Sequence, residues 1–234
     1  MPYTTYHTDF VKRDMREVDL KASGGTTYYW HPKDKAVFPF GFGLSYSKFE
    51  FKWSNKPPAK LAIPSTLATA NSRSFTTNHT VTVTNVGDRV SDIVALAFVV
   101  AVPGASPPDM PLRKLFGFER FHAMAPKESR TAYFESTAES LGVVVESGAK
   151  KLLPGKYSIE IGSVSLKDDP AENNNQQTHS KAVSEIELVG AELTTEENLW
   201  IQELARKSKG KRMLKRRMMG KPTVAQVKQM KQID

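Results

Sequence analysis

Between residues 49 and 188 the chain breaks into short stretches rich in β-branched and aromatic residues, and this spacing constrains the fold more than any other feature. Phe49–Trp53 alternates apolar and polar residues, and Thr80–Thr84 alternates Thr and Val, a pattern typical of half-buried strands. Ile93–Val102 is continuously apolar, as expected of a central strand. The same spacing predicts further strands at Arg113–His122, Arg130–Glu135, Leu141–Glu146, Lys156–Ile161 and Ala182–Leu188.

Turn residues separate these stretches. Asn85–Asp88 supplies turn chemistry, Pro154-Gly155 initiates the last hairpin, and Asp168–Thr178 is predicted to be a polar loop. About seven short strands joined in this way favour a β-sandwich of immunoglobulin type, for which about 140 residues are enough. The predicted fold class is therefore mainly β.

The two ends of the chain differ from this central part. Residues 1–27 are polar, and an aromatic-rich stretch follows them, so we expect an irregular lead-in. Thr194–Glu197 fits a capping box, which predicts a helix beginning near Thr195. We expect residues 191–234 to form a helical, basic and mobile tail.

The net charge of +8 belongs to that tail. Residues 206–234 hold 11 Lys and Arg against one acidic residue, Asp234, so the rest of the chain is close to neutral. Two interpretations stay open: the tail contacts nucleic acid or an anionic membrane surface, or it is a solvated extension. No apolar run approaches the roughly 18 residues that span a membrane.

Residue types limit the chemistry. The absence of cysteine excludes disulfides, thiolate metal sites and cysteine nucleophiles. The five histidines lack metal-ligand spacing, Ser45 is outside a GxSxG motif, and Asp14, Glu17 and Asp19 fit a solvated surface run. We therefore expect no catalytic residue, no metal and no cofactor.

Three stretches in a fixed order carry a family resemblance. Thr26–Trp30 followed by Val37–Phe49 (VFPFGFGLSYSKF) resembles the junction between the α/β-sandwich domain and the fibronectin III-like domain of family 3 glycoside hydrolases. Thr80–Val94 is similar to a strand pair of that module, and Lys114–Phe121 with Pro154–Tyr157 resembles its "LKGFERV … PGxY" signature.

The resemblance implies a domain plan and a location. Residues 1–47 are expected to be a remnant of the α/β-sandwich domain and linker, residues 48–190 a fibronectin type III-like β-sandwich, and residues 191–234 the tail. The resemblance also implies that the nucleophilic Asp lies in an N-terminal (β/α) barrel and the acid/base residue usually in the domain after it, so we expect both before residue 1. The resemblance implies a secreted, extracellular location, although Met1–Phe10 lacks a signal-peptide pattern.

The aromatic stretch has two interpretations. Its rings can pack a domain interface, or they can stack on an oligosaccharide, with Tyr29, Trp30 and His31 as substrate-binding candidates. Gly41 and Gly43 permit turns and close backbone approach. Asn78-His79-Thr80 is an N-glycosylation sequon.

The sequence thus predicts the C-terminal accessory part of a β-glucosidase/β-xylosidase-type hydrolase of O-glycosyl bonds, which braces preceding catalytic domains and is inactive alone. The alternative is a stand-alone binding or adhesion module whose basic tail contacts an anionic partner.

Overall fold

The computed structural model describes residues 3–12, 14, 16–65, 75–164 and 180–196. The chain divides into two units at Glu196, and the residues that the structure describes all belong to the first, residues 1–196. The predicted loop Asp168–Thr178 and most of the predicted basic tail lie outside the described residues.

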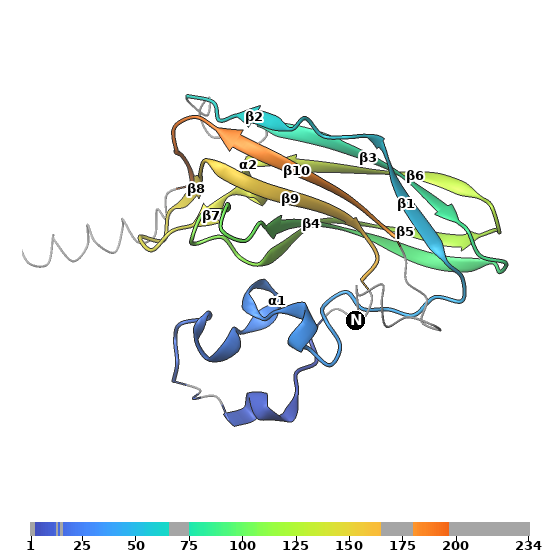
Figure 1. Cartoon of the computed structure of the whole chain (residues 1–234), viewed down its shortest axis with the longest axis horizontal. Helices are drawn as coiled ribbons and strands as arrows, with labels where there is room; N and C mark the ends of the chain where they lie inside the picture. Colours follow the sequence, from blue (N-terminus) through green and yellow to red (C-terminus); the bar gives the residue numbers. More distant parts are fainter. Residues whose placement is uncertain (1–2, 13, 15, 66–74, 165–179, 197–234) are drawn as a thin grey trace, which may run out of the picture. The chain divides into compact units, whose positions relative to one another are not determined.

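Two antiparallel sheets dominate the first unit, so the predicted mainly β sandwich is confirmed (Figure 1). The three-stranded sheet has the order β1–β3–β6 and the five-stranded sheet the order β2–β10–β9–β4–β5, in which only the β2–β10 pairing is parallel. The first sheet comprises β1 (Phe49–Asn55), β3 (Thr76–Asn85) and β6 (Ser129–Thr137). The second comprises β2 (Lys60–Ala62), β4 (Ser91–Ala101), β5 (Arg113–Met124), β9 (Gly155–Gly162) and β10 (Lys181–Val189).

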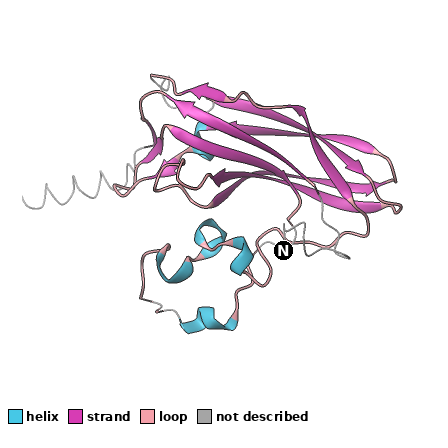
Figure 2. Ribbon diagram, viewed as in Figure 1, coloured by secondary structure: helices cyan, strands magenta, loops and turns pink. Residues whose placement is uncertain are grey.

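The remaining elements are short. A third sheet pairs β7 (Val143–Val144), β8 (Lys150–Leu152) and β11 (Leu193–Glu196). Most helical segments belong to the lead-in, which we define as residues 3–48 (Figure 2). They are η1 (Thr8–Lys12), η2 (Ala22–Gly24), α1 (Thr27–Trp30) and η3 (Lys33–Lys35), while α2 (Ala138–Leu141) follows β6.

The main core lies between the two large sheets. Val81 and Val83 of β3 have no exposed surface, and Ile159 and Ile161 of β9 are equally buried in the same cluster. The alternation seen in the sequence therefore becomes one inward-facing and one solvent-facing row on each strand of the three-stranded sheet.

Strand β4 is apolar on both faces, which explains its continuous apolar run. Ala95, Ala97 and Val99 join the main core. Leu96 and Phe98 point to the other side, where they form a second cluster with Val164. A strand needs this composition only when both of its faces are covered.

Two predicted elements are wrong in part. Within the predicted strand Leu141–Glu146, only Val143–Val144 is a strand, because Leu141 is the last residue of helix α2. This helix begins with a capping box: the Thr137 hydroxyl accepts a hydrogen bond from the Ser140 backbone N–H, and the Ser140 hydroxyl accepts one from the Thr137 backbone N–H. Residues Leu193–Glu196 form β11 rather than a helix start, because they pair with β8 and the Thr195 hydroxyl donates to the Lys150 carbonyl at 3.0 Å. Pairing with an available strand edge outweighed the local capping pattern.

The other predicted strands are confirmed within β1, β3, β4, β5, β6, β9 and β10. Strand β1 begins at Phe49, close to the predicted boundary between residues 47 and 48. The division of the chain into three domains stays a prediction.

Candidate functional site

The most distinctive site is the seam where the lead-in covers the outer face of the five-stranded sheet. Tyr28 lies at its centre: its ring stacks on Phe40 at 4.1 Å between centroids and on Tyr29 at 4.3 Å, and meets Phe98 edge-on at 6.5 Å. The Tyr28 hydroxyl accepts a hydrogen bond from the Leu115 backbone N–H at 3.3 Å. Burial, followed by the contact with Tyr29, raises the pKa of Tyr28, so this phenol stays neutral.

The Pro39–Gly43 loop brings its backbone against β4. Gly41 has a φ of +84°, and a Cβ there would lie 2.5 Å from Leu96 Cδ1 and 3.2 Å from Val164 Cγ2. The expected need for glycine is confirmed at Gly41. Gly43 has neither a positive φ nor a close neighbour.

Charged groups line the same seam. The guanidinium of Arg113 lies 3.9 Å from the Phe98 ring centroid, and Arg113 is buried. Burial lowers the pKa of Arg113, and the charge of Glu160 opposes that effect. The pKa of Lys33 is lowered to about 8, first by burial and then by the charges of Lys181 and Arg113. Cations from the lead-in and from two strands therefore share one partly desolvated region.

The end of the lead-in is fixed by Asn85, which has no exposed surface. Its side-chain oxygen accepts hydrogen bonds from the Ser47 hydroxyl at 2.6 Å and the Gly87 N–H at 3.0 Å, while its amide donates to the Arg89 and Met124 carbonyls. All groups of the buried amide are thus satisfied, and the Ser47 contact joins this turn to the end of the lead-in.

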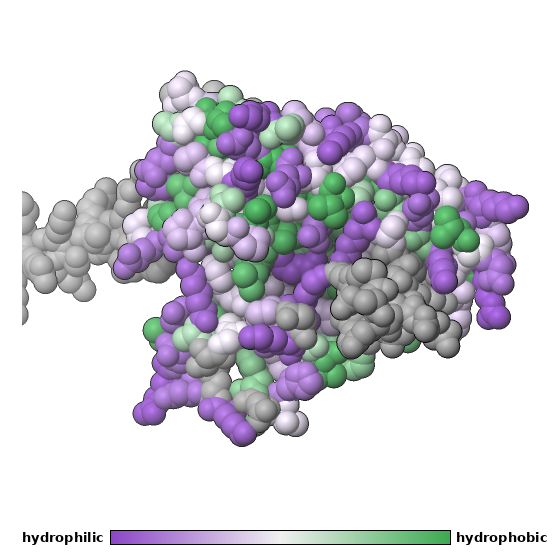
Figure 3. Space-filling model, in the orientation of Figure 1, coloured by the Kyte–Doolittle hydropathy of each residue, from purple (hydrophilic) through white to green (hydrophobic). Residues whose placement is uncertain are grey.

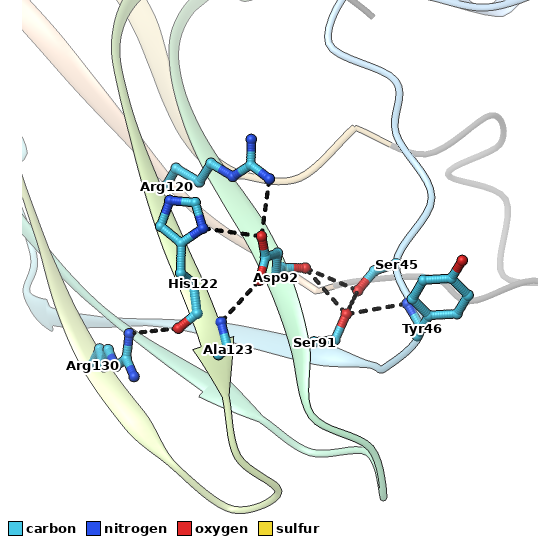
Figure 4. A network of polar contacts seen from close by, with 8 residues as sticks. All are labelled: Ser45, Tyr46, Ser91, Asp92, Arg120, His122, Ala123 and Arg130. Carbon is cyan, nitrogen blue, oxygen red and sulfur yellow. Dashed lines mark hydrogen bonds and ion pairs between the residues drawn. The ribbon is translucent and has the colours of Figure 1, made fainter.

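A second polar network holds the preceding residues of the lead-in (Figure 4). The Ser45 and Ser91 hydroxyls lie 2.8 Å apart, Ser45 donates to the Asp92 carbonyl at 3.2 Å, and the Tyr46 N–H donates to Ser91 at 3.2 Å. These contacts join the predicted domain junction to the start of β4.

The carboxylate of Asp92 is the charged centre of this network (Figure 4). It accepts hydrogen bonds from the Ala123 N–H at 2.8 Å, from Arg120 at 2.9 Å and from His122 Nδ1 at 3.1 Å. The Ala123 N–H, then Arg120 and then His122 lower the pKa of Asp92 to about 2. A single ionised carboxylate held by three donors suits positioning, whereas glycoside hydrolysis commonly needs a pair of carboxyl groups.

A groove of about 370 Å³ opens beside this network. Two of its apolar side chains are largely exposed: Phe118 by 71% and Leu44 by 91%. On the side of the molecule seen in Figure 3, hydrophobic residues lie in small groups among hydrophilic ones. The groove lining combines the junction loop with β4 and β5: Phe40, Gly41, Phe42, Gly43, Leu44, Ser45, Asp92, Ile93, Val94, Leu96, Leu115, Phe118, Arg120 and Ser163.

The three predicted sugar-binding residues have different neighbours. Tyr29 packs on Tyr28, and its carbonyl accepts a hydrogen bond from the Leu112 N–H at 2.8 Å. The Trp30 ring lies under the Lys21 ammonium at 4.8 Å. His31 bonds through Nδ1 to the Gly24 carbonyl and meets the Tyr6 ring edge-on. These contacts fit packing within the lead-in and, at Tyr29, against the sandwich, and sugar binding by the three residues stays a prediction.

Asp92, Arg120 and His122 are not recognisable as a group in the sequence. Their proximity depends on the register of β4 with β5, in which Val94 faces Arg120 and a bulge lies between Ser91 and Ile93. Charged residues at alternate positions of one predicted strand were the available signal, but the register that gives them a partner is not visible in the sequence.

Within the described ranges, no group of three or more His, Cys, Asp or Glu side chains is arranged to hold a metal ion. The same part of the chain contains no helix long and apolar enough to cross a membrane.

The fold defines a β-sandwich whose five-stranded sheet is covered by the lead-in, and the comparisons show the family to which such a sandwich belongs. Residues 94–165 match the family model of the fibronectin type III-like domain. The chain is 36% identical over 175 residues to a probable exo-1,4-β-xylosidase of Aspergillus fumigatus, covering 69% of this chain and 22% of that protein. It is 35% identical over 168 residues to an exo-1,4-β-xylosidase of Emericella nidulans, covering 68% of this chain and 21% of that protein.

Solved structures give the same relationship. A family 3 exo-β-xylosidase in complex with a xylobiose aziridine probe superposes with a TM-score of 0.67 at 26% identity, covering 83% of this chain and 25% of that one. A β-glucosidase from Listeria innocua in complex with gluconolactone superposes with a TM-score of 0.50 at 25% identity, covering 74% of this chain and 22% of that one. The chain is therefore similar to the C-terminal region of family 3 glycoside hydrolases, including its fibronectin type III-like domain. It spans about a fifth of the length of the curated relatives it matches.

Proposed function

We propose that this chain is the C-terminal accessory part of a β-xylosidase/β-glucosidase-type glycoside hydrolase, where it braces the preceding catalytic domains. The observation that carries this proposal is the seam, in which the Tyr28–Phe40 stack covers Phe98 on the second apolar face of β4. The lead-in resembles a domain junction. Because it packs on the five-stranded sheet, it is proposed to hold the sandwich in a fixed position relative to the domain that precedes the junction.

The exposed groove beside the junction is the surface proposed to touch the catalytic domains. Leu44 and Phe118 supply apolar contact area, and Arg120 and Asp92 supply charges at its edge. An apolar centre with a polar rim is the usual composition of a protein interface. Hydrolysis of O-glycosyl bonds is assigned to the neighbouring domains, and the parent enzyme is proposed to act outside the cell.

The first experiment asks whether the chain has activity of its own. The purified chain is incubated with nitrophenyl glucosides and xylosides, and we expect no release of nitrophenol. Sustained turnover would refute the assignment of chemistry to other domains.

The second experiment tests the bracing role. The matching C-terminal region of the Aspergillus fumigatus relative is replaced by this chain, and the rate of thermal inactivation of xyloside hydrolysis is measured. We expect Phe118→Ser to speed inactivation of the chimera severalfold, whereas Thr82→Ala, on the opposite outer face, leaves it unchanged. Equal inactivation rates for the two variants would contradict the proposed contact surface.

A second candidate function rests on the 11 Lys and Arg among residues 206–234. In this proposal the tail binds an anionic partner, either nucleic acid or anionic lipid. Truncation after Glu196 retains β11 and removes the basic residues, so loss of binding to anionic vesicles or to nucleic acid after truncation supports it. Unchanged binding contradicts it.

A sugar contact by Tyr29, Trp30 and His31 is tested in the same chimera. Trp30→Ala is expected to raise the KM for xylo-oligosaccharides while leaving kcat unchanged. An unchanged KM assigns Trp30 to packing alone.

A further inference from the structure

The outer face of the three-stranded sheet is covered by polar residues. Its register aligns Thr84 with Glu50 and Ser129, and Thr82 with Lys52 and Thr131. Short hydroxyl contacts and an ion pair cross this surface, namely Thr84–Ser129 at 2.8 Å, Ser54–Thr82 at 2.5 Å and Lys52–Glu50 at 2.8 Å. We call this surface the polar outer face.

Asn78 lies on this face. Its side chain is exposed, and Thr80, two residues further along β3, lies on the same face because side chains alternate along a strand. Between them His79 points inward and has no exposed surface. The asparagine and the threonine of the one Asn-X-Thr sequon in the sequence are thus presented together, away from the core.

On one side of Asn78 the neighbouring strand ends before it reaches this residue. The pairing of β1 with β3 ends at Asn55 and Thr80, so within the described strands β1 does not extend beside Asn78. On the other side Asn78 is paired with Glu135 of β6, whose side chain is exposed. Among the described residues paired with this part of β3 on the outer face, Tyr133 opposite Thr80 is the one large exposed aromatic side chain.

We propose that Asn78 is a site of N-linked glycosylation when the chain passes through the secretory pathway. The Asn78 Nδ2 forms a bond to C1 of N-acetylglucosamine from a lipid-diphosphate-linked oligosaccharide. The bond between C1 and the phosphate oxygen breaks, the lipid diphosphate leaves with the electron pair, and one amide proton is released. Thr80 supplies the hydroxyl that the sequon requires.

The proposal assigns a role to the whole face. A bulky, solvated glycan at Asn78 keeps the polar outer face in water. The face that carries it is then excluded from close packing with another domain, which leaves the opposite side of the sandwich for protein contact. The glycan does not depend on the glycosidase relationship, so the two proposals fail independently.

The test expresses the full chain behind a secretion signal in a eukaryotic host, with a reporter Asn-Gly-Thr sequon appended after Asp234. Peptide mapping by mass spectrometry, before and after peptide N-glycosidase treatment, reads each site separately. We expect Asn78 to carry a glycan and to be converted to Asp by the enzyme. A chain whose reporter is glycosylated while Asn78 is unmodified overturns the proposal.

Variants separate the sequon from the fold. Asn78→Gln and Thr80→Ala are expected to abolish modification at this position and to leave the reporter glycan in place, whereas Thr80→Ser retains modification. A glycan still found on the 78–80 peptide of Thr80→Ala would contradict the assignment. Mapping of the unaltered chain keeps the proposal testable if a variant fails to fold.

Discussion

The two outer faces of the sandwich differ in composition, and the difference shows how each is used. The five-stranded sheet presents Leu96 and Phe98 outward, and the lead-in covers them with Tyr28 and Phe40. The three-stranded sheet presents threonine, serine and charged residues, and it carries the exposed Asn78. A second apolar cluster packs on the outer face of the five-stranded sheet, whereas the outer face of the three-stranded sheet is exposed to water.

Strands β3 and β4 also differ in the residues that face outward. On β3, every second residue is polar because water lies outside. On β4, both sets of alternate residues are apolar because each faces a packed layer. Changes on the two faces should therefore have very different consequences.

The largest effect is expected from Phe98→Ala, which leaves a cavity under Tyr28 and Phe40. Phe98 is only 2% exposed, and truncation of such a side chain costs about 3–5 kcal/mol of unfolding free energy. Urea denaturation followed by tryptophan fluorescence measures the change. A loss below about 1 kcal/mol would show that the lead-in is not part of the folded core.

A pH-dependent loss of stability is expected from His79, which lies directly beneath the polar outer face. Burial lowers the pKa of His79 from its ordinary 6.5 to about 4. The unfolded chain therefore binds a proton that the folded chain excludes, and stability is full above pH 6.5 and falls as the pH drops toward 4. The total loss is up to about 3 kcal/mol.

The control for this prediction is His79→Gln, which removes the titrating group next to Ser136. The difference in unfolding free energy between the two proteins is measured from pH 7 to pH 4. Parallel pH profiles would mean that the imidazole accepts its proton inside the fold.

Gly41→Ala tests how closely the Pro39–Gly43 loop packs against β4. A Cβ at φ +84° within 2.5 Å of Leu96 Cδ1 strains the backbone and displaces the second cluster, at a cost of about 1–3 kcal/mol. Gly43→Ala meets no neighbour within 4 Å and should be neutral. Thermal unfolding midpoints of both variants test this, and equal midpoints contradict it.

Tyr28→Phe removes one hydrogen-bond acceptor from the seam and retains the ring. The Leu115 N–H then loses the Tyr28 hydroxyl, with an expected cost of about 1 kcal/mol. Tyr46→Phe is the matched control because Tyr46 is largely exposed. If the two variants are equally stable, the contact contributes nothing.

The smallest effect is expected on the polar outer face. Thr82→Ala removes a hydroxyl contact with Ser54 in a solvated setting, so the unfolding free energy should change by less than about 1 kcal/mol. A loss as large as that of Phe98→Ala would show that this face is also covered, and would abolish the distinction between the faces.

Local patterns were sufficient where neighbouring residues decide the outcome. The alternation at Thr80–Thr84 and the apolar run at Ile93–Val102 placed β3 and β4, because strand burial has a period of two residues. A local pattern gave the wrong result at Leu193–Glu196. A capping pattern predicted a helix there, but these residues form a strand that pairs with β8. A capping box stabilises a helix only if no better partner is within reach.

The class of fold and the order of the strands along the chain follow from the sequence alone, as does the presence of a turn that contains Gly41 and Gly43. Only the tertiary structure decided which apolar face the lead-in covers, that Asp92 meets Arg120 and His122, and that Asn78 points away from every packed layer. The physical reason is that periodicity acts over a few residues, whereas register and layer packing join residues that are tens of positions apart.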